Sequence, residues 1–94
     1  MIVVTARGDA DPLDFEVIVR DARGETRHEI TLSAADWARL GGGKGAPALV
    51  RAAFAFLLDR EPKEAILSRF DLSAIARYFP EFERELPRYL SERA

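Results

Sequence analysis

The side chains that could do chemistry are few in this chain and lie far apart in the sequence. His28 is the only histidine, and there is no cysteine. A single imidazole cannot form a conventional zinc site or a Ser-His-Asp triad, although carboxylates could join it. Alternation places His28 on one strand face with Ile30 and Leu32, so we expect it to pack at the edge of a buried sheet face. An enzyme or small-ligand binder that uses His28 with carboxylates remains one hypothesis.

Two other clusters could bind or catalyse, and each has a simpler structural interpretation. The glycine-rich stretch 41–45 carries Lys44 before an expected helix, where backbone N–H groups can hold an anion. It lacks the GxxxxGK[ST] pattern of a phosphate loop, so we interpret it as a flexible connection. The charged junction 59–64 offers paired carboxylates. We expect it to be solvated, with Asp59 or Glu61 capping the next helix. We predict no catalytic residue, no cofactor and no metal site.

Aromatic side chains are the candidates for an interaction surface. Tyrosine hydroxyls need water or a hydrogen-bond partner, so we expect Tyr78 and Tyr89 at the boundary of the core. A group of aromatic rings left exposed together marks a site for a partner. The candidate residues are Trp37, Tyr78, Phe82 and Tyr89.

Composition limits the class of protein. The chain has 94 residues with a net charge of −2, 48% hydrophobic and 32% charged residues, which is typical of one globular domain, here 1–94. A basic excess is absent, so we expect no nucleic-acid partner. A small DNA-binding regulator or antitoxin-like protein remains the alternative.

The longest apolar run, 52–58, is too short to span a membrane. The start of the chain lacks the basic region of a signal peptide, which favours a cytoplasmic protein.

The first part of the chain, 1–32, predicts three antiparallel strands. A short β-branched strand spans 2–6, and two alternating runs follow within 13–32. The stretch 21–24 suits a turn with Gly24 at positive φ, so these runs form a hairpin. Three strands are stable only when one sheet face is covered.

The remainder, 33–94, predicts four or five short helices. Ser33 is the expected N-cap of the first, with Asp36 three residues later. Apolar side chains at 82, 86, 89 and 90 form the stripe of the last helix, which we expect Pro87 to kink or split. The predicted helices span 33–40, 47–60, 62–70, 71–79 and 80–91. The fold class is therefore α+β, with the helices packed around the apolar helix 47–60.

The helix 47–60 is apolar over about 200° of its circumference, whereas a surface helix needs a stripe of little more than about 100°. Either the sheet and the later helices of the same chain cover this surplus, or a second copy does. Symmetric dimers are the commonest oligomers, so we predict a homodimer. The function that follows is a non-enzymatic interaction or regulatory module that associates with itself and binds one further protein.

Two stretches resemble a known group of sequences. The segment 56–82, FLLDREPKEAILSRFDLSAIARYFPEF, together with HEITLS at 28–33, is similar to short uncharacterised bacterial proteins that couple a β-hairpin to an FLLxREPxxxIL..FDL..I..YFPE pattern. The resemblance covers about a third to half of the chain. It implies a stand-alone bacterial protein and assigns no activity and no site residue.

Overall fold

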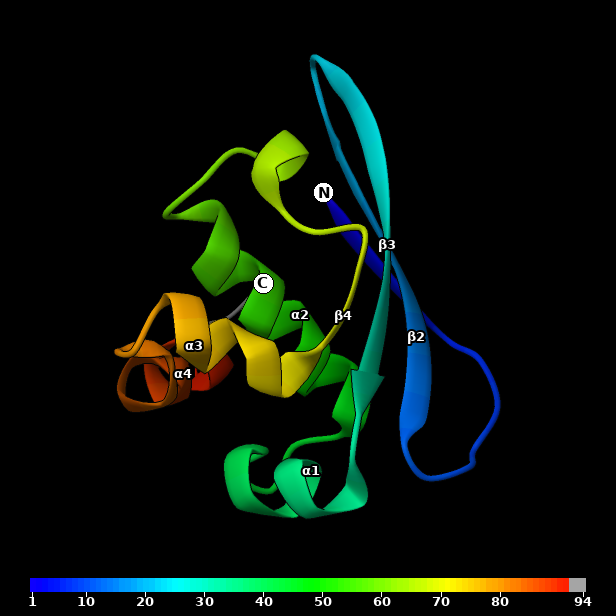
Figure 1. Cartoon of the computed structure of the whole chain (residues 1–94), viewed down its shortest axis with the longest axis vertical. Coiled ribbons are helices and arrows are strands. Elements are labelled where there is room, and N and C mark those ends of the chain that lie inside the picture. Colours follow the sequence, from blue (N-terminus) through cyan, green and yellow to red (C-terminus); the bar gives the residue numbers. More distant parts are fainter. Residues whose placement is uncertain (92–94) are drawn as a thin grey trace.

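The computed structural model describes residues 1–91 and confirms an α+β fold in two layers (Figure 1). A curved sheet forms one layer, and the helices lie against one of its faces. The strands are β1 (Ile2–Ala6), β2 (Leu13–Asp21), β3 (Gly24–Leu32) and β4 (Arg69–Asp71). The helices are α1 (Ala34–Leu40), α2 (Ala46–Leu58), α3 (Ile75–Tyr78) and α4 (Phe82–Ser91), with 3₁₀ turns η1 (Lys63–Ala65) and η2 (Leu72–Ala74).

The sheet has four strands in the order β1-β2-β3-β4, not the three that we predicted. β1, β2 and β3 form the expected antiparallel meander. β4 pairs parallel to β3, with Phe70 opposite Ile30. The sheet is therefore mixed, and its last strand comes from the part of the chain that we expected to be helical.

The helix predicted over 62–70 is wrong, because this stretch forms η1 and then β4. Without β4, one edge of β3 would leave its backbone groups unpaired. The Glu29 N–H donates to the Ser68 carbonyl at 2.8 Å, and the strand pairing continues from there to Asp71. Pairing with a distant strand has overridden the local helical pattern.

Two local predictions are confirmed. Gly24 has φ 122° at the turn of the β2–β3 hairpin, a conformation that favours glycine. The Asp36 N–H donates to the Ser33 hydroxyl at 3.0 Å, which caps α1.

α4 runs through Pro87 without being split. Proline removes one intrahelical donor, and the buried side chains of Phe82 and Leu86 keep this helix packed against the rest of the chain.

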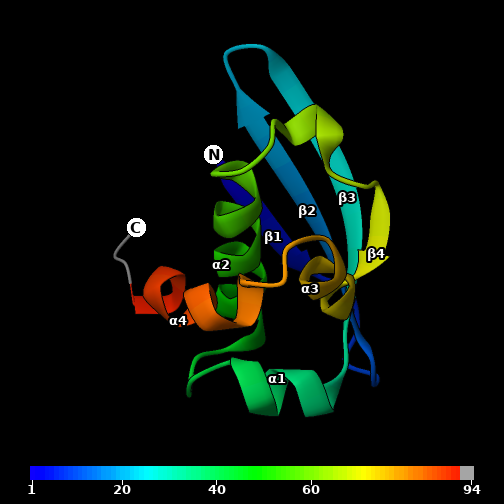
Figure 2. The ribbon, with the colours of Figure 1, turned by 60° about the vertical axis from the view of Figure 1, so that its left-hand side comes forward.

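α2 is enclosed by its own chain. Its large apolar side chains, from Leu49 to Leu57, are at most 3% exposed. Phe54 lies toward the sheet, with its ring 5.3 Å from that of His28, whereas the Phe56 ring lies 5.0 Å from that of Phe82 in α4. Figure 2 shows α2 between the sheet and α4. The predicted enclosure on two flanks is confirmed within one chain, so covering the large apolar side chains of α2 requires no second copy.

Candidate functional site

An apolar pocket opens between the end of α2, the connection from η1 to β4, and α3. Its volume is about 340 Å³, at the lower end of the range for binding sites of small ligands. The lining residues are Leu57, Glu61, Ala65, Ile66, Leu67, Phe70, Ala74, Ile75, Tyr78 and Phe79. Glu61 supplies the only carboxylate in this lining, so the pocket offers an apolar surface with one acidic margin.

Two of the lining residues are also large hydrophobic side chains exposed to solvent. Leu67 is 52% exposed and Tyr78 is 68% exposed. They belong to different walls, Leu67 to the connection before β4 and Tyr78 to the end of α3. Such side chains gathered around one concave site are typical of a recognition surface.

Lys63 fixes η1 on the β2–β3 hairpin. Its side chain is 2% exposed, and its ammonium donates to Asp21 Oδ1 at 2.8 Å and to Glu64 Oε2 at 2.7 Å. The hydrogen bond from Lys63 lowers the pKa of the Asp21 carboxyl, and the Lys63 pKa is raised by the same pair. The turn that leads to the pocket is therefore tied to a strand end that is 42 residues away in sequence.

His28 holds the next part of the same wall. Its Nδ1 lies 2.8 Å from the Leu67 carbonyl oxygen, and its Nε2 lies 2.8 Å from the Thr26 hydroxyl. Since a carbonyl only accepts, Nδ1 carries the proton and donates to it. His28 is 3% exposed and packs against Phe54. The imidazole thus positions the backbone of Leu67, while the Leu67 side chain remains at the pocket rim.

Asp71 joins β4 to η2 and α3, which supply other lining residues. Its carboxylate accepts from the Thr31 hydroxyl of β3, and from the Ser73 N–H at 3.0 Å and the Ser73 hydroxyl at 2.6 Å. The Ser73 N–H bond caps η2, which leads directly into α3. Burial opposes the charged form, but the bonds from Ser73 and Thr31 outweigh it and lower the Asp71 pKa.

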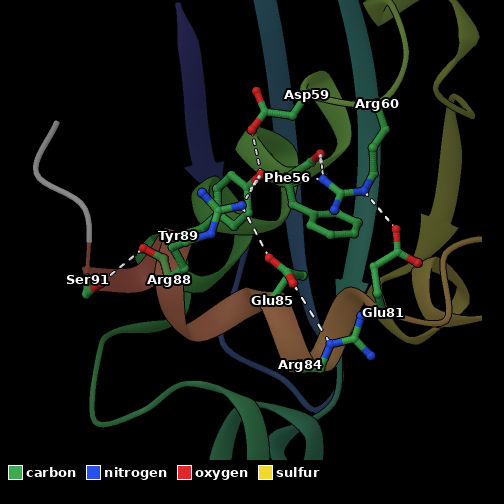
Figure 3. A network of polar contacts seen from close by, with 9 residues as sticks. All are labelled: Phe56, Asp59, Arg60, Glu81, Arg84, Glu85, Arg88, Tyr89 and Ser91. Atoms are coloured by element: carbon green, nitrogen blue, oxygen red, sulfur yellow. Dashed lines mark hydrogen bonds and ion pairs between the residues drawn. The ribbon is translucent and has the colours of Figure 1, made fainter.

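A polar network closes the end of α2 against α4 (Figure 3). The Arg60 guanidinium lies 3.6 Å from the centre of the Phe56 ring and donates to Glu81 at 3.0 Å. It also donates to the Phe56 carbonyl at 3.3 Å and to the Tyr89 hydroxyl at 3.4 Å. The Tyr89 hydroxyl in turn donates to Asp59. The cation lies at the negative end of the α2 dipole, a favourable place for it.

The four candidate aromatic residues, Trp37, Tyr78, Phe82 and Tyr89, do not form one exposed group. Phe82 is 1% exposed and Tyr89 is 8% exposed, because both rings pack against Phe56 in the core. Only Tyr78 lies at the candidate site. The Tyr89 ring therefore belongs to the core, and its hydroxyl lies at the core boundary, where it donates to Asp59.

Trp37 is 37% exposed and folds over the glycine-rich stretch 41–45. Its indole N–H donates to the Lys44 carbonyl at 2.9 Å. A Cβ on Gly41 would lie 2.8 Å from the Trp37 ring, so this close approach requires glycine. The stretch forms a turn with two residues at positive φ, Gly42 and Gly43.

The pocket and His28 are separate, since His28 is not among the lining residues. Both of its ring nitrogens face protein partners. Within residues 1–91, no group of three or more His, Cys, Asp and Glu side chains could hold a metal ion.

At the charged junction 59–64, Asp59 and Glu61 do not cap η1, whose N-cap is Pro62. Neither carboxylate therefore has the role that we expected.

Arginines on the open face of the sheet alternate with glutamates. Arg7 pairs with Glu16 at 2.9 Å and Glu29 at 3.1 Å, and Glu16 also pairs with Arg27 at 2.7 Å. This face is therefore a mixed ladder of charges and differs from the basic surface typical of nucleic-acid binding. No helix of the described chain is long and apolar enough to cross a bilayer.

No protein-family model, curated protein or solved structure matches this chain. The resemblance of 56–82 to short bacterial proteins stays a prediction.

Sequence reasoning missed the pocket because its walls depend on β4. One local signal was present. Asp71 followed by Ser73 is the spacing of a side-chain cap, and it marks a break at the point where we expected the preceding helix to end.

Proposed function

We propose that this protein is a non-enzymatic interaction module, and that its pocket receives an apolar side chain from an exposed segment of a partner protein. The observation that carries the proposal is the position of Leu67 and Tyr78, two exposed hydrophobic residues from different segments that line one apolar pocket. Burying such residues against a partner removes apolar surface from water, which favours association.

The construction of the walls supports recognition by a preformed surface. Lys63, His28 and Asp71 each fix one segment of the lining to β2 or β3. A site that is already ordered loses little conformational entropy on binding.

A test uses N-acetyl-tryptophanamide and N-acetyl-leucinamide as probes of side-chain binding. We expect millimolar concentrations to produce saturable shifts in the amide NMR signals of the lining, including Ile66 and Ile75. The variant with both Leu67→Ser and Tyr78→Ser should lose these shifts. Ile18→Ser, on the open sheet face, should keep them, and circular dichroism should show both variants folded. Shifts that do not saturate, or that survive in the double variant, would overturn the proposal.

A further inference from the structure

The two edges of the sheet differ in the features that prevent strands from pairing between molecules. β4 has three residues, of which Arg69 and Asp71 are charged, and the Arg69 side chain is 81% exposed. Short strands and charges are common protective features at sheet edges. β1 has five residues, Ile-Val-Val-Thr-Ala, with no charge, proline or glycine. The β1 edge therefore lacks the protection that the β4 edge has.

The hydrogen bonds at the two ends of β1 show which backbone groups face outward. Met1 and Arg20 exchange bonds of 2.8 and 2.9 Å, and the Arg7 N–H donates to the Asp14 carbonyl at 2.8 Å. In an antiparallel pair, alternate residues face the partner strand. The N–H and C=O groups of Ile2, Val4 and Ala6 therefore point away from β2. Within residues 1–91, no strand lies on that side.

We propose that β1 pairs antiparallel with β1 of a second copy of this chain, around a two-fold axis at Val4. In this register Val4 faces its own copy and Ile2 faces Ala6 of the other chain. Each outward residue then exchanges both backbone bonds, about six in all. The sheets of the two chains become one continuous sheet, and the open β1 edge disappears.

The side chains of β1 suit this symmetric pairing. Ile2, Val4 and Ala6 pair with Val19, Val17 and Phe15 in β2, so they share the helix-covered face. In the dimer these apolar side chains would meet one another. Val3 would lie opposite Thr5 of the second copy on the open face, and pairs of β-branched side chains favour strand pairing.

α2 is the helix that lies against β1. It packs against β1, as Figure 2 also shows. Extending the sheet through β1 would place the α2 helices of both chains on the same face. Ala48, Ala55 and Leu58 of α2 remain only half-buried in one chain, and short alanine side chains allow helices to approach closely.

The test removes one outward donor. Ala6 is exposed and its N–H faces away from β2, so Ala6→Pro leaves the pairing within the chain intact. In the dimer the same change removes a bond on each side of the axis, and it should raise the dimer dissociation constant about tenfold or more. Ala6→Lys, which adds a charge to this edge, should also weaken the dimer. Size-exclusion chromatography with light scattering over a range of concentrations gives the constant.

Arg69→Pro is the matched control. The Glu29 N–H to Ser68 bond shows that the Arg69 N–H faces the outer side of β4, so this variant removes an outward donor from the opposite edge. It should leave the dissociation constant unchanged. A wild-type protein that stays at 10.5 kDa up to high micromolar concentration would overturn the proposal. So would Ala6→Pro and Ala6→Lys variants that are folded and dimerise as the wild type does. The pocket lies at the other edge, so failure of this proposal leaves the pocket proposal intact.

Discussion

His28 and Lys63 are the polar side chains buried in the described part of this protein, and both are used to hold the segment that precedes β4. A buried polar group without a partner costs about 1–3 kcal/mol. None of the buried side-chain polar atoms among residues 1–91 lacks a hydrogen bond. A histidine and a lysine that could suggest chemistry in the sequence therefore act as structural connections between distant parts of the chain.

We predict that His28→Leu lowers the free energy of unfolding by about 1–3 kcal/mol. Leucine fills much of the space beside Phe54, but it leaves the Leu67 carbonyl without its donor. Urea unfolding at neutral pH measures the change. Thr26→Val is the comparison, because it removes only the partner of Nε2 and should cost less. An equal cost for both variants would show that the bond to Leu67 contributes little.

β4 is the element on which the pocket depends, although it is only three residues long. It completes the sheet on one side, and through Asp71 it begins η2 and α3 on the other. The Asp71 carboxylate thus connects β4 to β3 and also caps η2, which leads into α3. The two walls that carry Leu67 and Tyr78 are positioned by this short element.

We predict that Asp71→Ala destabilises the protein by about 1 kcal/mol or somewhat more, because it removes a cap and the acceptor for Thr31. Asp71→Asn keeps an acceptor oxygen and should recover part of the loss. Chemical denaturation of both variants gives the comparison. If the asparagine variant is as unstable as the alanine variant, then the charge of Asp71 matters more than its hydrogen bonds.

Across the described part of the molecule, several carboxyls have pKa values that the fold lowers. The pKa values of Asp21, Glu64, Asp71 and Glu81 are lowered. For Asp21 and Glu64 the main cause is the bond from Lys63. For Glu81, its own backbone N–H and Arg60 are the causes. A carboxyl with a lowered pKa stabilises the folded state above its usual pKa, and this contribution is lost as the pH falls.

We therefore predict that the contribution of these carboxylates to the urea midpoint is complete above about pH 5 and is lost as the pH falls below about 4.5. The usual pKa values of 3.8 for Asp21 and 4.5 for Glu64 place the start of this loss. Lys63 has a raised pKa, so its contribution is present below 10.5 and decreases above that value. Lys63→Met should make the acid loss shallower. A midpoint that rises on acidification to pH 3 would contradict these directions.

The sequence by itself determined the features that depend on neighbouring residues. Alternation gave the β2 and β3 faces, Gly24 gave the turn, and Ser33 with Asp36 gave the start of α1. The enclosure of 47–60 also followed, since a helix with that much apolar surface must be covered. These features depend on spacing along the chain, and spacing is visible in the sequence.

Only the tertiary structure decided that 62–70 forms η1 and β4, and therefore that the pocket exists. The apolar spacing of this stretch is compatible with a helix. The stretch pairs with the edge of β3 instead, because this pairing satisfies backbone groups of two distant segments. Likewise, the apolar stripe of the last helix predicted a buried face for Phe82 and Tyr89, but only the packing shows that both rings lie against Phe56 of α2. Contacts between segments that are far apart in sequence depend on the complete packing, and no local pattern encodes them.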